Sequence, residues 1–218
     1  MSARPTMLIV PTRDELGRVV AEAIASAIRE RDTTRLALAG GTTPRGCYEH
    51  LACIDVPWGL VTVFFGDERC VPAGDPESNY EQARQALLQQ VAPASVHRMV
   101  GELGPEAAAR EYEPLVAAAP LDLVLLGIGQ DGHTASLFPG NAALDATTHV
   151  SAVFGAPKPP PHRVTLTLRT LCEARRVMIM ASGSDKADAV RRALAGEVPA
   201  GLIDAAEWFV TADAAPRP

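Results

Sequence analysis

The sequence contains no apolar run that approaches the length of a membrane-spanning helix. Its first residues, MSARPTMLIVPTRDE, hold an apolar stretch that is too short for a secretory signal, and no small-residue cleavage site follows. We therefore expect a cytoplasmic protein with no membrane partner.

Cysteine is also scarce, and its spacing excludes a disulfide framework. The four cysteines, Cys47, Cys53, Cys70 and Cys172, form no CxxC pair, which is typical of free thiols in a reducing compartment. Cys47, His50 and Cys53 are spaced so that they could share a helix edge, but no fourth zinc ligand follows nearby. Free cysteines in helices are usually buried, so we predict no metal site.

Basic residues form no stripe along the chain. The sequence has 20 Lys and Arg against 26 Asp and Glu, a net charge of -6. A nucleic-acid backbone requires a basic face, so we expect no nucleic-acid partner. Net charge does not exclude an anionic small molecule, because the local field inside a cleft governs binding.

Two common catalytic or nucleotide-binding motifs are missing, and a third is matched without the context that it needs. No GxxxxGK[ST] sequence occurs, so a nucleoside triphosphate is not indicated. Residues 127–132 match GxGxxG, but Pro139 interrupts the chain where a dinucleotide fold needs a long helix, and no acidic residue follows at the required distance. Without a GxSxG elbow, a serine acyl-enzyme has no support beyond the nearby Ser136.

What is present is a regular alternation of helical and strand-like segments. Apolar periodicity predicts helices over 12–31, 106–118 and 185–195, with further helices opening at Thr43-Pro44, where Thr43 is the expected cap, and at Ser78. Strands are predicted over 35–39, 61–65, 121–126, 163–168, 177–181 and 208–211. We expect a single α/β domain over residues 1–218, a three-layer sandwich with a mostly parallel central sheet. The proline-rich segment 156–161 is expected to be a surface connection.

Ligands of open parallel sheets bind outside the carboxyl ends of the strands. Three glycine-bearing turns should therefore converge: 40–43, 66–69 and 127–133.

The first turn indicates an anion site. Gly40, Gly41, Thr42 and Thr43 place small residues and two hydroxyls where a helix begins, and helix N-termini favour anions. The alternative is an ordinary glycine turn capped by threonine.

Two cations are candidate phosphate contacts. Lys186 stands in the first turn of a predicted helix, where the helix dipole disfavours a cation. A bound phosphate would make a cation favourable at this position. Its alternative is a lysine in water or paired with Asp185 or Asp188. Arg163 at the start of its strand is either a second clamp or a solvated arginine.

The third turn contains a titratable pair. His133 can take and return a proton near neutral pH, and Asp131 lies two residues before it. The other histidines, His50, His97, His149 and His162, are interpreted as incidental.

Taken together, residues 38–44, 65–69, 78–80 and 127–140 resemble the 6-phosphogluconolactonase family, part of a larger group that includes glucosamine-6-phosphate deaminases. The resemblance implies a deaminase-like (modified Rossmann) α/β fold. It implies hydrolysis of 6-phospho-D-glucono-1,5-lactone to 6-phosphogluconate in the oxidative pentose phosphate pathway, without metal or organic cofactor.

The same resemblance implies roles for individual residues. His133 acts as general base for water, Asp67 and Arg69 line the reacting end, and Arg69 is a candidate to stabilise the oxyanion. Gly41, Thr42 and Lys186 hold the phosphate, with Arg163 as a further cationic contact. Asp131 is a candidate to orient the imidazole.

Two alternatives remain. The deaminases carry Asp-Glu-Tyr where this chain has Asp67-Glu68-Arg69, and Phe-Asn-Glu-Pro at 136–139, where this chain reads Ser-Leu-Phe-Pro. In the deaminases that glutamate serves ring opening. Here the first carboxylate after Asp131 is Asp145, beyond a proline and a glycine, so hydrolysis is favoured. A non-catalytic sugar-phosphate-binding protein would need an output module, and none is visible in the sequence. We expect a monomer or weak homo-oligomer, and the sequence leaves open whether 157–161 forms a lid.

Overall fold

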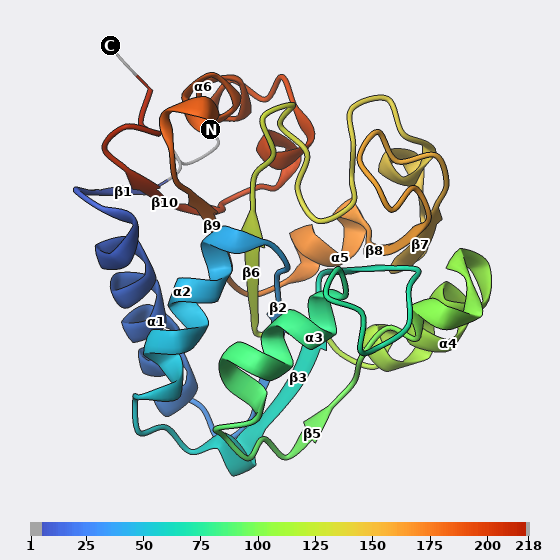
Figure 1. Cartoon of the computed structure of the whole chain (residues 1–218), viewed down its shortest axis with the longest axis horizontal. Coiled ribbons are helices and arrows are strands. Elements are labelled where there is room, and N and C mark those ends of the chain that lie inside the picture. The colour runs from blue at the N-terminus through green and yellow to red at the C-terminus, as the bar shows by residue number, and fades with distance from the viewer. Residues whose placement is uncertain (1–5, 217–218) are drawn as a thin grey trace.

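A computed structural model describes residues 6–216 of the chain, and its centre is a seven-stranded sheet. All six neighbouring strand pairs in this sheet are parallel. Its strand order is β1-β10-β9-β6-β2-β3-β5 (Figure 1). The strands span Met7–Val10 (β1), Thr34–Leu38 (β2), Val61–Phe65 (β3), Ser95–Val96 (β5), Leu123–Gly127 (β6), Val177–Ala181 (β9) and Glu207–Thr211 (β10). The predicted α/β architecture with a mostly parallel sheet is confirmed.

Helices and short helical turns connect these strands. The α-helices are α1 (Arg13–Arg29), α2 (Thr42–Ala52), α3 (Asn79–Ala83), α4 (Pro105–Ala117), α5 (Leu168–Glu173) and α6 (Ala187–Leu194). The shorter turns are η1 (Trp58–Leu60), η2 (Arg84–Leu88), η3 (Gly101–Leu103), η4 (Ala142–Asp145), η5 (Ser184–Lys186) and η6 (Pro199–Leu202). No helix in this part of the chain combines the length and the apolar character needed to cross a bilayer.

The central strands are buried on both faces. Along β2, Leu36 and Leu38 pack in the core under α1 and α2, whereas Ala37 between them packs in the core under α4. Parallel strands covered on both faces read as continuous apolar runs, which explains why β3 and β9 have the bounds that the sequence predicts.

A second, smaller sheet was missing from the predictions. It has the order β4-β8-β7, with β4 at Asp67–Arg69, β7 at Val150–Val153 and β8 at Arg163–Leu166. Both of its strand pairs are antiparallel. Strand β8 ends at Leu166, two residues before the predicted end, because α5 begins at Leu168.

The helix starts agree with the sequence at two places and differ at one. Thr12 and Ser78 accept hydrogen bonds from the backbone N–H of Glu15 and Glu81, so both helices begin where the sequence predicts. At α2 the predicted Thr43 cap is wrong, because Gly41 is the capping residue with φ of 98° and the helix already begins at Thr42. A glycine tolerates this left-handed conformation without steric cost.

Candidate active site

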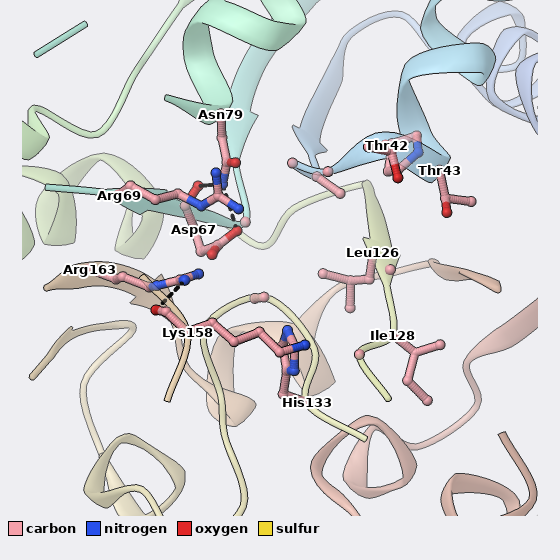
Figure 2. Close-up of a pocket in the computed structure, with 18 of the residues that line it drawn as sticks. Thr42, Thr43, Asp67, Arg69, Asn79, Leu126, Ile128, His133, Lys158 and Arg163 are labelled. Atoms are coloured by element: carbon pink, nitrogen blue, oxygen red, sulfur yellow. Dashed lines mark hydrogen bonds between the residues drawn. The ribbon is translucent and has the colours of Figure 1, made fainter. Parts of the chain in front are cut away.

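The three glycine turns meet at one cleft of about 290 Å³ outside the carboxyl ends of β2, β3 and β6. Figure 2 shows the arrangement, with Thr42 and Thr43 on one side of the cleft and Asp67 and Arg163 on the other. The lining includes nine of the ten predicted site residues: Gly40, Gly41, Thr42, Thr43, Asp67, Arg69, His133, Arg163 and Lys186. The tenth, Asp131, contacts His133 from behind. The predicted convergence of the turns is confirmed.

The N-terminus of α2 opens directly into the cleft. Gly41 has no side chain that could cap the helix, and a helix N-terminus whose N–H groups lack a side-chain cap favours an anion. Gly40 permits the close approach of the Asn79 side chain, because a Cβ added at Gly40 would lie 1.8 Å from Oδ1 of Asn79. A side chain at Gly40 would therefore displace Asn79, and one at Gly41 would strain the backbone at its φ of 98°.

His133 is held in one orientation by three neighbours. Its Nδ1 contacts Oδ1 of Asp131, and its ring stacks on Phe138 with centroids 4.4 Å apart. Gly129 lies under the ring edge, where an added Cβ would come within 2.0 Å of Nδ1. Because an ionised carboxylate only accepts, Nδ1 carries the proton and Nε2 keeps a free lone pair.

The environment favours the neutral imidazole. Burial lowers the pKa of His133 below its ordinary value, and the hydrogen bond and charge of Asp131 oppose this shift without cancelling it. Burial works to raise the pKa of Asp131, but the contact with His133 outweighs it and the net shift is downward. The pair at neutral pH is therefore a carboxylate beside a neutral, proton-accepting imidazole.

Asp67 is fixed on the opposite wall by two donors. Ser136 donates its hydroxyl to Oδ2 at 2.5 Å, and Asn79 donates from Nδ2 to Oδ1 at 2.9 Å. Asp67 is 6% exposed, and Oδ1 of Asn79 is buried with no partner among the described residues. This wall presents fixed polar atoms that suit the hydroxyls of a sugar.

Glu68, a residue that the sequence reasoning did not single out, supports this wall from behind. It is 2% exposed, and its carboxylate accepts from the Ser78 hydroxyl and from the N–H groups of Arg69, Asn79 and Tyr80. Burial raises its pKa, and these hydrogen bonds oppose the rise. The only sequence signal was its place between Asp67 and Arg69.

The predicted cations differ in what they bind. Lys186 pairs with Asp185 at 2.9 Å, which is the pairing that the alternative interpretation of this lysine predicted. It also lines the cleft. Arg163 is 4% exposed, so the solvated alternative is wrong. Its guanidinium donates to three loop carbonyls, and no phosphate contact is needed to explain its burial. Arg69 donates from Nη1 to the Glu77 carbonyl.

A cation that was not predicted, Lys158, also lines the cleft. It stands in the proline-rich segment, which was expected to be only a surface connection. The chain has two lysines against eighteen arginines, and Lys158 and Lys186 are the two. The preference for arginine over lysine is visible in the sequence, and the two lysines are the exceptions to it.

Other candidate groups do not form a site. Cys47 is buried and Cys53 exposed, and His50 contacts Asp14 at 3.0 Å. Within residues 6–216, His, Cys, Asp and Glu side chains form no cluster that could hold a metal ion.

Comparison with known proteins shows the family to which the chain belongs. The family described as "Glucosamine-6-phosphate isomerases/6-phosphogluconolactonase" matches residues 12–211. The chain belongs to this family. A 6-phosphogluconolactonase of Mycobacterium leprae is 42% identical over 208 residues, which are 87% of this chain and 84% of that protein.

Solved structures of the family share the fold. A 6-phosphogluconolactonase from Thermotoga maritima is 28% identical with a TM-score of 0.87, covering 95% of this chain and 99% of the other. A monomeric glucosamine-6-phosphate deaminase is 26% identical with a TM-score of 0.83, covering 96% and 98%. The family therefore contains both of the activities weighed from the sequence, and the choice between them depends on the cleft.

Proposed function

We propose that this chain hydrolyses 6-phospho-D-glucono-1,5-lactone to 6-phosphogluconate, the lactonase step of the oxidative pentose phosphate pathway. The observation that carries the proposal is the position of His133. Its imidazole, oriented by Asp131, lies in the same cleft as the open N-terminus of α2. An anion bound at the helix places the rest of a sugar phosphate within the cleft beside the base.

The reaction follows from the protonation state of His133. Nε2 takes a proton from water while the water oxygen attacks the lactone carbonyl carbon, and the carbonyl electron pair moves onto the oxygen. When this pair returns, the bond from carbon to the ring oxygen breaks, and the ring oxygen takes the proton from Nε2. The product is an open-chain acid that releases one proton at neutral pH. No metal or organic cofactor takes part.

The phosphate binds at the other end of the cleft. Gly40, Gly41, Thr42 and Thr43 supply backbone N–H groups and hydroxyls, and Lys186 supplies a charge that a dianion would share with Asp185. Asp67 and Arg69 line the end where the ring lies. Holding the substrate at both ends aligns its carbonyl with the base, which is how positioning accelerates such reactions.

The cleft favours hydrolysis over deamination. Among the described residues that line it, Asp67 is the only carboxylate. Asp145, the first carboxylate after Asp131, lies in η4 and is not part of the lining. The glutamate of the deaminase Phe-Asn-Glu-Pro sequence, which serves ring opening in those enzymes, therefore has no counterpart among the described residues of this cleft.

Substitution of His133 tests the proposal. We expect His133→Ala to lower kcat about 10²–10⁴-fold in a pH-indicator assay with freshly generated lactone, corrected for spontaneous opening. Binding of 6-phosphogluconate should be retained. His50→Ala removes a histidine outside the cleft and serves as control. Unchanged turnover in His133→Ala would refute the assigned base, and ammonia release from glucosamine 6-phosphate by the wild-type protein would identify a deaminase.

A wild-type protein that binds 6-phosphogluconate but does not accelerate lactone opening would be a non-catalytic sugar-phosphate-binding protein. The cytoplasmic location, the single domain and a monomeric or weakly associated state remain predictions.

A further inference from the structure

We infer that Lys158 is the cation that stabilises the negative charge formed on the lactone carbonyl, and that Arg163 is the positioning residue that holds Lys158 in place. The inference rests on the proposed function. It starts from the loop between β7 and β8, which carries Lys158 over the cleft (Figure 2).

The backbone of this loop is bound by one buried side chain. Arg163 donates from Nε to the carbonyl of Pro160 at 2.9 Å, and from Nη2 to those of Lys158 at 2.9 Å and Pro159 at 3.2 Å. The loop is closed at its base by the N–H of Ala156, which donates to the Pro161 carbonyl at 2.9 Å. Three consecutive carbonyls held by one guanidinium fix the peptide from which the Lys158 side chain projects.

Within the part of the chain that the structure describes, the ammonium of Lys158 makes neither a salt bridge nor a hydrogen bond to another side chain. Among residues 6–216, no acidic oxygen lies within salt-bridge distance of its Nζ, whereas Lys186 pairs with Asp185 at 2.9 Å. Arg163 donates to the loop carbonyls, and Arg69 donates from Nη1 to the Glu77 carbonyl, while its Nε has no partner among the described residues. Lys158 is exposed, so its ammonium is bound by water that a ligand entering the cleft can replace.

The ammonium belongs to the His133 end of the cleft. Figure 2 shows the Lys158 side chain extending toward His133, well away from Thr42 and Thr43. Its positive charge acts on His133 in the direction that lowers the imidazole pKa, after the larger effects of burial and of Asp131. Lys158 therefore faces the reacting carbonyl, and the phosphate binds at the opposite end.

This position suits the charge that develops during hydrolysis. When water attacks, the electron pair of the carbonyl moves onto its oxygen, and an ammonium beside it stabilises the oxyanion without giving up its own proton. The pair then returns, the ring C–O bond breaks, and the proton passes from His133 to the ring oxygen. In the product the same ammonium faces a carboxylate, which also has a full negative charge.

Lys158→Met tests the inference, with Arg110→Met, an exposed cation on α4 outside the cleft, as the matched control. We expect kcat to fall about 10²-fold, within the range known for loss of one oxyanion donor, with KM changed much less. The acid limb of kcat/KM should move to higher pH, because the His133 pKa rises when the neighbouring charge is removed. Ethylammonium ions should restore part of the rate.

Ligand binding separates this role from a phosphate contact. Lys158→Met should weaken 6-phosphogluconate at least tenfold but leave glucitol 6-phosphate, which lacks the carboxylate, within about twofold. Equal weakening of both ligands, or a kcat within threefold of wild type, would overturn the inference. If wild-type protein fails to open the lactone at all, the proposed function fails first, and that outcome is distinct from an active Lys158→Met.

The part of Arg163 is tested by a double-mutant cycle. If Arg163 acts by positioning Lys158, Arg163→Met should lower kcat in the wild-type background and cost little more in the Lys158→Met background. Independent, multiplicative losses would assign Arg163 a separate role. Thermal melting of each variant shows whether it is folded at the assay temperature.

Discussion

Asp131 and His133 are joined through Oδ1 and Nδ1 within a single glycine-flanked turn, and Asp131 also accepts from the His133 backbone N–H at 3.3 Å. The carboxylate thus fixes both the ring and the turn that carries it. Because the contact holds the proton on Nδ1, it sets which nitrogen is free to act as a base. This relationship yields predictions for pH dependence and for substitution.

The first prediction is that kcat/KM of the wild-type protein stays constant through neutral pH and falls on the acid side with a midpoint below the ordinary histidine value. The reason is that the His133 pKa is lowered, chiefly by burial, so the neutral imidazole persists at pH 7. An indicator assay across pH 5 to 8 at several buffer concentrations measures it. A midpoint above about 7 would contradict the assignment.

The second prediction concerns Asp131→Asn. The amide can donate to Nδ1, which places the proton on Nε2 and removes the lone pair that accepts from water, so kcat should fall about 10²–10⁴-fold. The residual acid limb should move to lower pH, because Asp131 raises the His133 pKa in the wild type.

The substrate phosphate also titrates near pH 6, but it is the same in both proteins, so the displacement between their limbs reports the enzyme. A limb that does not move, with full activity, would show that Asp131 is only structural. The displacement is opposite in sign to that expected for Lys158→Met.

The third prediction is that Gly129→Ala displaces the base. The new methyl would lie 2.0 Å from Nδ1 of His133, so the ring must shift, and a shift of about 1 Å can cost on the order of 10²-fold in rate. Gly129 is not among the glycines with positive φ, so backbone strain is not the cause.

Gly46→Ala in α2 is the matched control for this variant. A Cβ at Gly46 meets nothing within 4 Å, so activity should be unchanged and stability raised by about 0.5–1 kcal/mol. Steady-state rates and urea midpoints of both variants check the pair. Wild-type kcat in Gly129→Ala would show that the ring position is not critical.

The sequence predicted the location of the cleft because two local signals suffice for it. Apolar runs such as Val61–Phe65 mark buried parallel strands, and the turns at their carboxyl ends must then meet. Lys158 and the burial of Arg163 were not predictable in this way. They depend on the path of the loop between β7 and β8, and on an antiparallel pairing of Asp67 with Thr165, which no local periodicity encodes.

Glu68 provides the last prediction, because its two carboxylate oxygens each accept two hydrogen bonds in a buried site. In Glu68→Gln, one amide NH₂ must face an N–H group of Arg69, Asn79 or Tyr80, and the orphaned donor should cost about 1–3 kcal/mol of stability. Burial raises the pKa of Glu68 in the folded protein, so the wild-type carboxyl contributes most stability below its unfolded value and loses it as pH rises through the folded one. The stability difference between wild type and Glu68→Gln should therefore be larger at pH 4 than at pH 7 in urea titrations.

Glu102→Gln, which breaks a surface pair with Arg98, is the control and should cost less than about 1 kcal/mol. An equal loss of stability in both variants would contradict the role assigned to Glu68.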